Sequence, residues 1–319
     1  MSTPVEAALE SPDDVIAERR HLTNLAYRLL GSPAEAEDAV QETYARWYAL
    51  SRERRAAVDN PAAWLTTVAT RVCLDQLGSA RARRERYVGE WIPEPLPDRT
   101  EWGLSDPADR ITLDESVNMA FLVVLEAMTP AERVAFVLHD VFRYPFADIA
   151  TMLGRTPAAC RQLAASARRR LRAARTTPPS TPGRAALIRD FKEAWEAKDI
   201  DALLALLAPD ATLVADGGGL VGAVLRPLEG ATRIADYLLF IATKAPALTL
   251  LERTVNGTPG LVAQNAGRTV TVAAFDLSDT RVTRIWAVRN PEKLRAWQWG
   301  EEDGNVMPGT GTDTASAEE

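Results

Sequence analysis

The sequence predicts a multidomain protein in which two all-α domains precede a C-terminal α+β domain. Two stretches with helical apolar periodicity, residues 15–88 and 112–175, are separated by the proline-rich residues 91–109. A second linker, TTPPSTPG at 176–183, precedes a segment that becomes strand-like from about residue 211. Helices followed by a run of strands are typical of an α+β domain.

These signals divide the chain into six segments. We expect a helical domain over 15–88, a linker over 89–111, a second helical domain over 112–175, a linker over 176–183, an α+β domain over 184–300 and a disordered acidic tail over 301–319. Four helix starts support the helical part, because each combines a capping side chain with proline at the first helical position. The capping residues are Ser32, Asn60, Thr129 and Thr156.

The composition is that of an ordinary globular protein, with 46% hydrophobic and 25% charged residues among 319. No apolar run reaches the roughly 20 residues that span a bilayer. The acidic start MSTPVEAALESPDD lacks the order of a signal peptide. The two cysteines, Cys73 and Cys160, indicate neither a disulfide framework nor a metal site. We therefore expect a cytoplasmic protein that uses no metal and no cofactor.

The net charge of −7 conceals two basic patches. Residues 133–175 contain nine arginines and two acids, and residues 71–86 contain five arginines and two acids. Local basic patches, rather than the total charge, mark a nucleic-acid-binding surface. Solvated helix faces would also explain either patch alone.

The helix that begins after Ser32 has two chemically different sides. Val40, Tyr44 and Trp47 fall on one side and predict its core face. The opposite side carries two carboxylates and an amide, from Asp38, Gln41 and Glu42. This polar side suits a basic protein partner, and the same pattern also describes a solvated face.

The helix that begins after Asn60 predicts a nucleic-acid contact. Its polar side carries Trp64, Thr67, Arg71 and Asp75. A tryptophan can stack on a base and an arginine can hold a phosphate. The basic cluster that follows, Arg81, Arg83 and Arg84, suits a DNA backbone. The alternative is a partly buried core tryptophan followed by a solvated basic turn.

The segments AEDAVQETYARWYAL and NPAAWLTTVATRVCLDQLGSARARR together resemble region 2 of extracytoplasmic-function (ECF) sigma factors. In that family the first helix binds the β′ clamp of core RNA polymerase, and the second melts and recognises the −10 promoter element. The resemblance implies a polymerase contact through Asp38, Gln41 and Glu42. It implies −10 DNA contacts through Trp64, Thr67, Arg71, Asp75, Arg81, Arg83 and Arg84.

The second helical segment predicts a helix-turn-helix. The short helix FADIATML ends at Gly154, and the arginine-rich helix PAACRQLAASARRRLRAAR follows. The first residues of such a recognition helix lie nearest base edges, and later arginines contact phosphates. The segment ERVAFVLHDVFRYPFADIATMLGRTPAACRQLAASARRRL resembles region 4 of the same family, which recognises the −35 element. The implied contacts are Arg155, Thr156, Ala158, Arg161, Gln162, Arg168, Arg169, Arg170 and Arg172.

The C-terminal segment resembles the SnoaL-like (NTF2-like) fold, a curved sheet wrapped round a helix to form a cone. Helices are expected over 184–208 and 231–246, and strands in LTLLERTV, GLVAQ, TVTVAAFDL and TRIWAVRN. Such cones often bind small molecules, and some catalyse with an Asp/His pair. No histidine follows His139, so catalysis is not expected. A small-molecule ligand in the cavity and a purely protein-contacting role both remain open.

Three short motifs resemble signatures of a sigma-factor subfamily with a fused SnoaL-like extension. They comprise Trp91, Pro93, Glu94 and Pro95 in WIPEP, Asp216, Gly217, Gly218 and Gly219 in DGGG, and Asn290, Pro291, Glu292, Lys293 and Leu294 in NPEKL. In that subfamily the extension replaces a separate anti-sigma factor and contacts the sigma domains. The resemblance implies that these residues meet between domains and tune activity in cis. Leu220 departs from the pattern, because the subfamily has lysine there.

The sequence thus predicts a non-enzymatic sigma factor whose partners are core RNA polymerase, through its β′ clamp and β subunit, and promoter DNA. A ligand-responsive regulator with one helix-turn-helix is an alternative, but it leaves the faces around Asp38 and Arg71 without a role. An enzyme of the SnoaL-like class with a DNA-binding appendage is a second alternative, against which the missing histidine counts.

Overall fold

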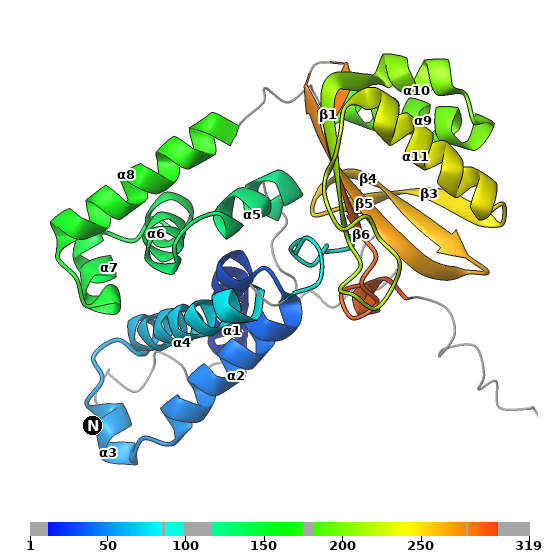
Figure 1. Ribbon diagram of the computed structural model, residues 1–319. Coiled ribbons are helices and arrows are strands. Elements are labelled where there is room, and N and C mark those ends of the chain that lie inside the picture. Colours follow the sequence, from blue (N-terminus) through cyan, green and yellow to red (C-terminus); the bar gives the residue numbers. More distant parts are fainter. Residues whose placement is uncertain (1–11, 85–86, 99–116, 175–180, 279, 299–319) are drawn as a thin grey trace, which may run out of the picture.

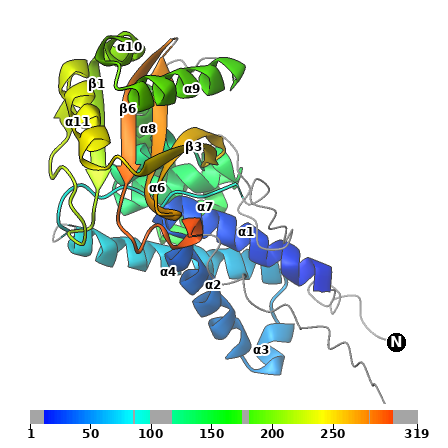
Figure 2. The same cartoon turned by 90° about the vertical axis from the view of Figure 1, so that its right-hand side faces the viewer.

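The computed structural model describes residues 12–84, 87–98, 117–174, 181–278 and 280–298. It has a helical part and a sheet-containing part that lie side by side, with the linker over 87–98 between them (Figures 1 and 2). The expected disordered tail over 301–319 lies outside the described residues. None of the helices in the described part of the chain is long and apolar enough to cross a bilayer.

The first helical domain begins with two helices joined by a tight turn. Its elements are α1 (Pro12–Leu30), α2 (Pro33–Tyr48), α3 (Arg52–Ala56) and α4 (Pro61–Arg84). Ser32 caps α2 by accepting the amide of Glu35. Asn60 caps α4 by accepting the amide of Ala63 at 3.0 Å. These two predicted helix starts are confirmed.

The second helical domain contains the predicted helix-turn-helix. Its elements are α5 (Met119–Glu126), α6 (Pro130–Phe136), η3 (Val137–Val141), α7 (Phe146–Leu153) and α8 (Pro157–Ala174). Gly154 ends α7 in the left-handed conformation, with φ +62°, which glycine adopts at little cost. Thr129 forms the predicted capping box with Glu132, and Thr156 accepts the amide of Ala159. The turn between α7 and α8 is therefore fixed by local chemistry.

The C-terminal domain is α+β, as predicted. Its helices are α9 (Thr181–Ala197), α10 (Ile200–Leu206), α11 (Ala231–Lys244) and the short 3₁₀ turn η4 (Arg295–Trp297). Its strands are β1 (Leu207–Asp216), β2 (Leu228–Glu229), β3 (Leu248–Val255), β4 (Thr258–Asn265), β5 (Arg268–Ser278) and β6 (Arg281–Val288). The order in the sheet is β2-β1-β6-β5-β4-β3. Strands β3 to β6 form an antiparallel meander, and β1 pairs in parallel with β6.

Two predicted elements differ from the structure. The linker expected over 176–183 is already helical from Thr181, where α9 begins. The single helix expected over 184–208 is two helices, because Lys198 is left-handed with φ +56° and Asp199 caps α10 through the amide of Ala202. The chain is already a strand at Leu207. The consecutive apolar residues Leu206 and Leu207 fit either a helix face or a strand, so periodicity alone could not place this boundary.

Both faces of the sheet are covered. On one face α9, α10 and α11 pack over a core that includes Phe191, Leu213 and Phe275. On the other face Val262, Val272 and Trp286 pack against Ile92 of the linker, Met119 of α5 and Trp297 of η4. The second side of the sheet is therefore buried by the linker, by α5 of the helical part and by η4 of the same domain.

The two helical domains share one hydrophobic core. It joins Leu25 and Leu29 of α1 and Val72 of α4 with residues of α6 and α7, among them Val134 and Ile149. A smaller cluster around Leu22, Val40 and Trp47 lies within the first domain alone. The described domains are thus packed together rather than separated by an open linker.

Candidate functional site

The polar side of α2 faces solvent. Asp38, Gln41 and Glu42 are all exposed, while Val40 and Trp47 on the opposite side are buried. Glu42 pairs with Arg46 one helical turn later at 2.8 Å, which is a surface contact of small energetic value. The three side chains therefore form an accessible, acidic surface, as the helix pattern predicts.

The polar side of α4 is partly covered. The indole of Trp64 is half-buried and packs against Trp47, with ring centroids 5.1 Å apart. Thr67 bonds to the carbonyl of Ala63 within its own helix, and Asp75 is exposed. Trp64 thus combines a core contact with a place on the predicted DNA face. The side chains of Arg81, Arg83 and Arg84 lie outside the described part of the structure.

Arg71 is exposed, and its guanidinium also contacts the second helical domain. Its guanidinium donates to the carbonyl of Met152 at 3.2 Å and to that of Thr151 at 3.1 Å. Both carbonyls belong to the last turn of α7, the first helix of the helix-turn-helix. The predicted −10 contact is therefore engaged by the second helical domain in this structure.

The start of the recognition helix α8 is open to solvent. The exposed residues are Arg155, Thr156, Ala158, Arg161 and Gln162. Because the cap at Thr156 and the glycine turn at Gly154 fix the direction of α8, these side chains share one accessible end of the helix. The structure brings the predicted base-contacting residues together.

Two of the later arginines of α8 form ion pairs with acidic side chains of the same domain. Arg168 forms a two-bond ion pair with Asp140, at 2.7 and 3.0 Å. Arg170 lies 3.9 Å from Glu132 and is exposed, as are Arg169 and Arg172. Arg133, which the sequence count places in the basic patch, is only 2% exposed. The basic surface is therefore smaller than the nine arginines of residues 133–175 predict, because Arg133 is buried and Arg168 is paired with an acid.

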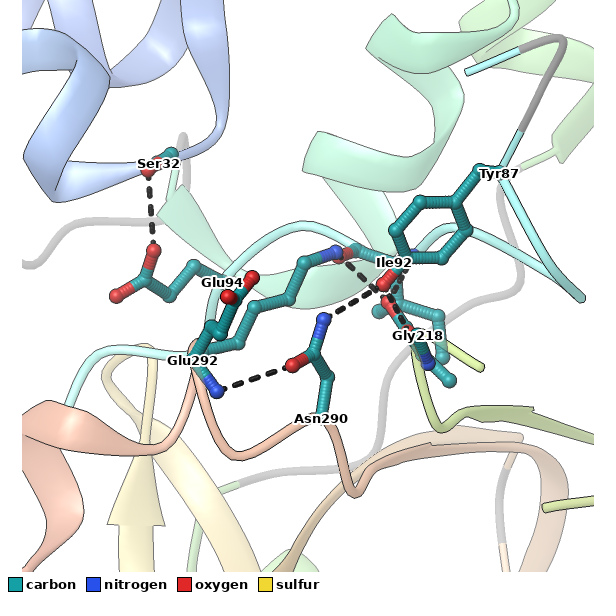
Figure 3. A network of polar contacts seen from close by, with 9 residues as sticks. Ser32, Tyr87, Ile92, Glu94, Gly218, Asn290 and Glu292 are labelled. Atoms are coloured by element: carbon teal, nitrogen blue, oxygen red, sulfur yellow. Dashed lines mark hydrogen bonds and ion pairs between the residues drawn. The ribbon is translucent and has the colours of Figure 1, made fainter. Parts of the chain in front are cut away.

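The WIPEP, DGGG and NPEKL motifs meet around the carboxylate of Asp216. Figure 3 shows Ile92, Gly218 and Asn290 of these motifs close together. Asp216 is fully buried at the end of β1. It accepts the hydroxyl of Tyr87 at 2.6 Å, the amide of Ile92 at 3.0 Å and the amide of Gly218 at 3.1 Å. Tyr87 and Ile92 belong to the linker, so one carboxylate of the C-terminal domain holds the linker at two points.

Lys293 supplies the countercharge. Its Nζ donates to Asp216 at 2.7 Å and to the carbonyl of Ile92 at 2.5 Å. The same ammonium lies 4.0 Å from the ring centroid of Trp91, within the range of a cation–π contact. A buried ion pair with all these donors and acceptors satisfied favours one arrangement of its partners. The pair therefore joins the linker to the C-terminal domain.

Asn290 and the glycines close the cluster. The amide nitrogen of Asn290 donates to the Tyr87 hydroxyl at 2.8 Å, and its oxygen accepts the amide of Glu292. Gly218 has φ +61°, and a Cβ there would collide with Asn290 and lie 3.0 Å from Tyr87 Oη. Burial, together with the hydrogen bond to Asp216, raises the pKa of Tyr87 above its usual range, so its hydroxyl stays a donor.

The remaining motif residues lie around this cluster. Gly217, Pro93, Pro95 and Leu294 are buried, whereas Gly219, Pro291 and Glu292 are exposed. Gly219 approaches Val88 of the linker, and Leu220 beside it is 59% exposed.

A second set of contacts binds the linker to the first helical domain. The amide of Glu94 donates to the carbonyl of Gly31 at 2.8 Å, and Glu94 Oε2 accepts the hydroxyl of Ser32 at 3.0 Å. Tyr27 Oη donates to the Glu94 carbonyl at 2.9 Å. Gly31 has φ +75°, and a Cβ there would lie 3.2 Å from the Trp91 ring. The linker is thus held on both sides.

Sequence reasoning missed several residues of this network. Asn256 is fully buried; it exchanges two bonds with Leu96 and donates to Tyr27 and to the carbonyl of Val117. Trp297 donates from Nε1 to the carbonyl of Pro95 at 2.9 Å. Asn256 begins an Asn-Gly turn with φ +52°, and such a turn is a sufficient reason for an asparagine at this position, so the sequence carries no signal of its binding role.

Glu94 makes the linker contact sensitive to pH. Burial raises its pKa to about 7, against the lowering effect of the Ser32 hydrogen bond. Between its ordinary pKa and 7 the folded protein holds a proton that the unfolded chain has lost, so stability falls as pH rises through this window. We expect Glu94→Gln to remove this part of the pH dependence and to melt about 2–4 °C higher above pH 7.

Thermal unfolding of wild type and Glu94→Gln between pH 5 and 8 measures the effect. Glu18, whose pKa burial also raises to about 7, contributes equally to both proteins and cancels in the comparison. Glu90→Gln, at an exposed acid of the same linker, is the matched control. Parallel curves for wild type and Glu94→Gln would show that Glu94 has no such role.

The C-terminal domain also has an open pocket of about 350 Å³. It lies where α10, β1 and the start of α11 meet. Its lining residues are Leu204, Leu207, Pro209, Glu229, Gly230, Ala231, Thr232, Arg233 and Arg281. The pocket is separate from the linker network, since none of the motif residues lines it.

Comparison with known proteins defines the class first. Residues 15–83 match the family model of sigma-70 region 2, and residues 118–171 match that of sigma-70 region 4. These are the promoter-recognising regions of RNA polymerase sigma factors.

Whole-chain relatives define the family. The ECF RNA polymerase sigma factor SigJ of Mycobacterium tuberculosis is 37% identical over 290 residues, which cover 87% of this chain and 91% of SigJ. The probable ECF sigma factor SigI of the same species is 35% identical over 283 residues, covering 87% and 92%. The crystal structure of SigJ matches with a TM-score of 0.73 and 33% identity over 90% of this chain and 99% of that one. The chain belongs to the ECF RNA polymerase sigma factors.

Proposed function

We propose that this sigma factor recognises promoters with its two helical domains and is regulated in cis by its C-terminal domain. The observation that carries the proposal is the linker over 87–98. It bonds to Gly31 and Ser32 on one side and to Asp216 and Lys293 on the other. A change in the C-terminal domain therefore acts directly on the segment that sets the positions of both promoter-recognising domains.

The polymerase contact is assigned to the acidic surface of α2. Asp38, Gln41 and Glu42 are exposed on one side of a well-capped helix, which suits a basic surface on the β′ clamp of core polymerase. The second helical domain contacts the β subunit. These contacts place the factor in the cytoplasm with its polymerase.

The DNA contacts are divided between two surfaces. The −10 element is assigned to α4, through Trp64, Thr67, Arg71 and Asp75 and the basic cluster Arg81, Arg83 and Arg84. The −35 element is assigned to α8. Base contacts come from Arg155, Thr156, Ala158, Arg161 and Gln162. Phosphate contacts come from Arg169 and Arg172, and from Arg168 and Arg170 when they leave Asp140 and Glu132.

Regulation in cis makes a separate anti-sigma factor unnecessary. The C-terminal domain buries one face of its sheet against Ile92 and Met119 of the sigma part, which is the kind of contact that a separate regulator would otherwise make.

In vitro transcription with core RNA polymerase tests this function. The template is a promoter recovered from genomic DNA by selection with the reconstituted holoenzyme. We expect promoter-specific transcripts that require both the factor and the core enzyme. A protein that binds duplex DNA tightly by itself and yields no transcript with polymerase would instead be a one-component regulator.

Arg161 gives a specific expectation. Because it is exposed at the start of α8, Arg161→Ala should remove about 1–3 kcal/mol of base discrimination, or about tenfold in promoter selectivity at one −35 position. Arg172→Ala should instead weaken all sequences alike and reduce the salt dependence of binding. Competition transcription on −35 variants distinguishes the two effects. Arg226→Ala, at an exposed arginine of the C-terminal domain, is the control, and an equal loss there would contradict the assignment.

A further inference from the structure

Arg143 lies in the turn between η3 and α7, where the chain enters the helix-turn-helix. Its φ is +64°, in the left-handed region that glycine adopts freely and that costs other residues energy. Among the described residues Lys198, Asn256 and Ala266 share this feature, and the last two lie in tight turns between strands. Glycine would occupy the position of Arg143 at lower cost, so the arginine side chain needs a separate explanation.

The surrounding residues fix the conformation of this turn. The amide of Tyr144 donates to the carbonyl of Leu138 at 2.9 Å, and the Tyr144 carbonyl oxygen lies 3.0 Å from His139 Nδ1. The His139 ring stacks on that of Phe146, with ring centroids 3.9 Å apart. A strained backbone persists where its surroundings determine it in this way. None of these contacts involves the side chain of Arg143, so the turn does not require an arginine.

The guanidinium of Arg143 is available to a partner outside the chain. The residue is exposed, and its side chain makes no hydrogen bond or ion pair with any residue that the structure describes. In the same domain Arg133 is buried, and Arg168 is paired with Asp140. The exposed acid nearest along the chain is Asp148, in the first turn of α7. The charge of Arg143 opposes the repulsion that Asp148 would exert on an anion there.

The place of Arg143 in the helix-turn-helix indicates the chemistry of that partner. α7 packs against α8 (Figure 1), and its eight residues make it about 12 Å long. The major groove of DNA is about 12 Å wide, and the first helix of a helix-turn-helix crosses the DNA backbone while the second enters the groove. With the exposed start of α8 in the groove, the start of α7 would therefore lie over the backbone at its edge.

We propose that Arg143 contacts a phosphate of the −35 DNA backbone at the start of α7. A guanidinium binds phosphate well because its N–H groups match the phosphate oxygens and its charge is permanent. The contact positions α8 without recognising sequence, since the backbone is the same at every base pair. This inference rests on the assignment of α8 to the −35 element in the proposed function.

Promoter binding by the reconstituted holoenzyme, measured at several salt concentrations, tests this contact. A phosphate contact releases condensed counterions, so Arg143→Gly should make the slope of log K against log salt less steep by about 1. We expect about three- to tenfold weaker binding, alike for all −35 variants. Arg143→Lys keeps the charge and should keep the slope. A promoter fragment that lacks the −35 element should bind wild type and Arg143→Gly equally.

Lys198→Gly is the matched control. Lys198 is also an exposed cation with a left-handed backbone, with φ +56°, but it lies between α9 and α10 of the C-terminal domain. Both glycine substitutions remove one charge and relieve backbone strain, so both proteins should unfold at the temperature of wild type or above it. Promoter binding should weaken in Arg143→Gly alone.

Two results would overturn the phosphate contact. One is an unchanged salt dependence of promoter binding in Arg143→Gly. The other is weaker binding of Arg143→Gly to core polymerase without DNA, which would assign the arginine to the polymerase instead. Failure of the proposed function looks different: the wild-type holoenzyme itself would then bind fragments with and without the −35 element equally well.

Discussion

Asp216→Asn should release the linker from the C-terminal domain while each domain stays folded. The carboxylate is fully buried, pairs with Lys293 and accepts three further donors from Tyr87, Ile92 and Gly218. Asparagine has the same shape, but it leaves the Lys293 ammonium without a countercharge in a buried site. Breaking one partner of such a pair costs about 3–5 kcal/mol.

Hydrogen exchange of the backbone amides over 87–98 measures this release. The amide of Ile92 donates to the substituted side chain, so its exchange should become at least about 100-fold faster, which corresponds to about 3 kcal/mol. Asp210→Asn, at an exposed aspartate of the same strand β1, is the matched control. Unchanged protection of the linker in Asp216→Asn would mean that the ion pair does not hold it.

Gly218→Ala should weaken the same contact by a different mechanism. Gly218 has φ +61°, and a Cβ would collide with the amide nitrogen of Asn290 and lie 3.0 Å from Tyr87 Oη. A non-glycine residue in the left-handed region costs about 1–3 kcal/mol before any collision is counted. Because the substitution changes no charge, its effect is steric and conformational.

Gly222→Ala provides the control for Gly218→Ala. It lies in the same loop, its φ is not in the left-handed region, and a Cβ there would meet nothing within 4 Å. Denaturant unfolding and limited proteolysis of the linker should therefore distinguish Gly218→Ala from wild type and leave Gly222→Ala unchanged. Equal behaviour of the two variants would show that the close approach of Gly218, Asn290 and Tyr87 is dispensable.

The helical domains were the most predictable part of the chain. Their starts depend on local chemistry, since Ser32, Asn60, Thr129 and Thr156 each bind an amide of their own first turn. The strands were also predictable, because the apolar runs that predict β3, β4 and β5 lie within the observed strands, and the run that predicts β6 extends only two residues beyond it. Leu206 and Leu207 fit both the helical and the strand periodicity, and the predicted boundary between helix and strand was wrong there.

The sequence predicted which residues belong to the candidate site, but not which of them contact each other. The motifs named Asp216, Lys293 and Trp91, but periodicity contains no information on which residues of distant segments meet. Arg133 shows the limit most clearly. In the sequence it is one more arginine of a basic patch, and only tertiary packing makes it a buried cap for Leu29. Tyr87 and Asn256 were missed for the same reason.

We propose above that the C-terminal domain controls transcription through the linker contact. The most direct measurement is the transcript yield of holoenzymes reconstituted with wild type, Gly218→Ala and Gly222→Ala, at equal amounts of bound factor. None of these substitutions alters a residue assigned to polymerase or DNA. We predict that Gly218→Ala changes the yield at least about threefold and that Gly222→Ala matches wild type. Equal yields from all three, with the linker of Gly218→Ala demonstrably released, would contradict the claim.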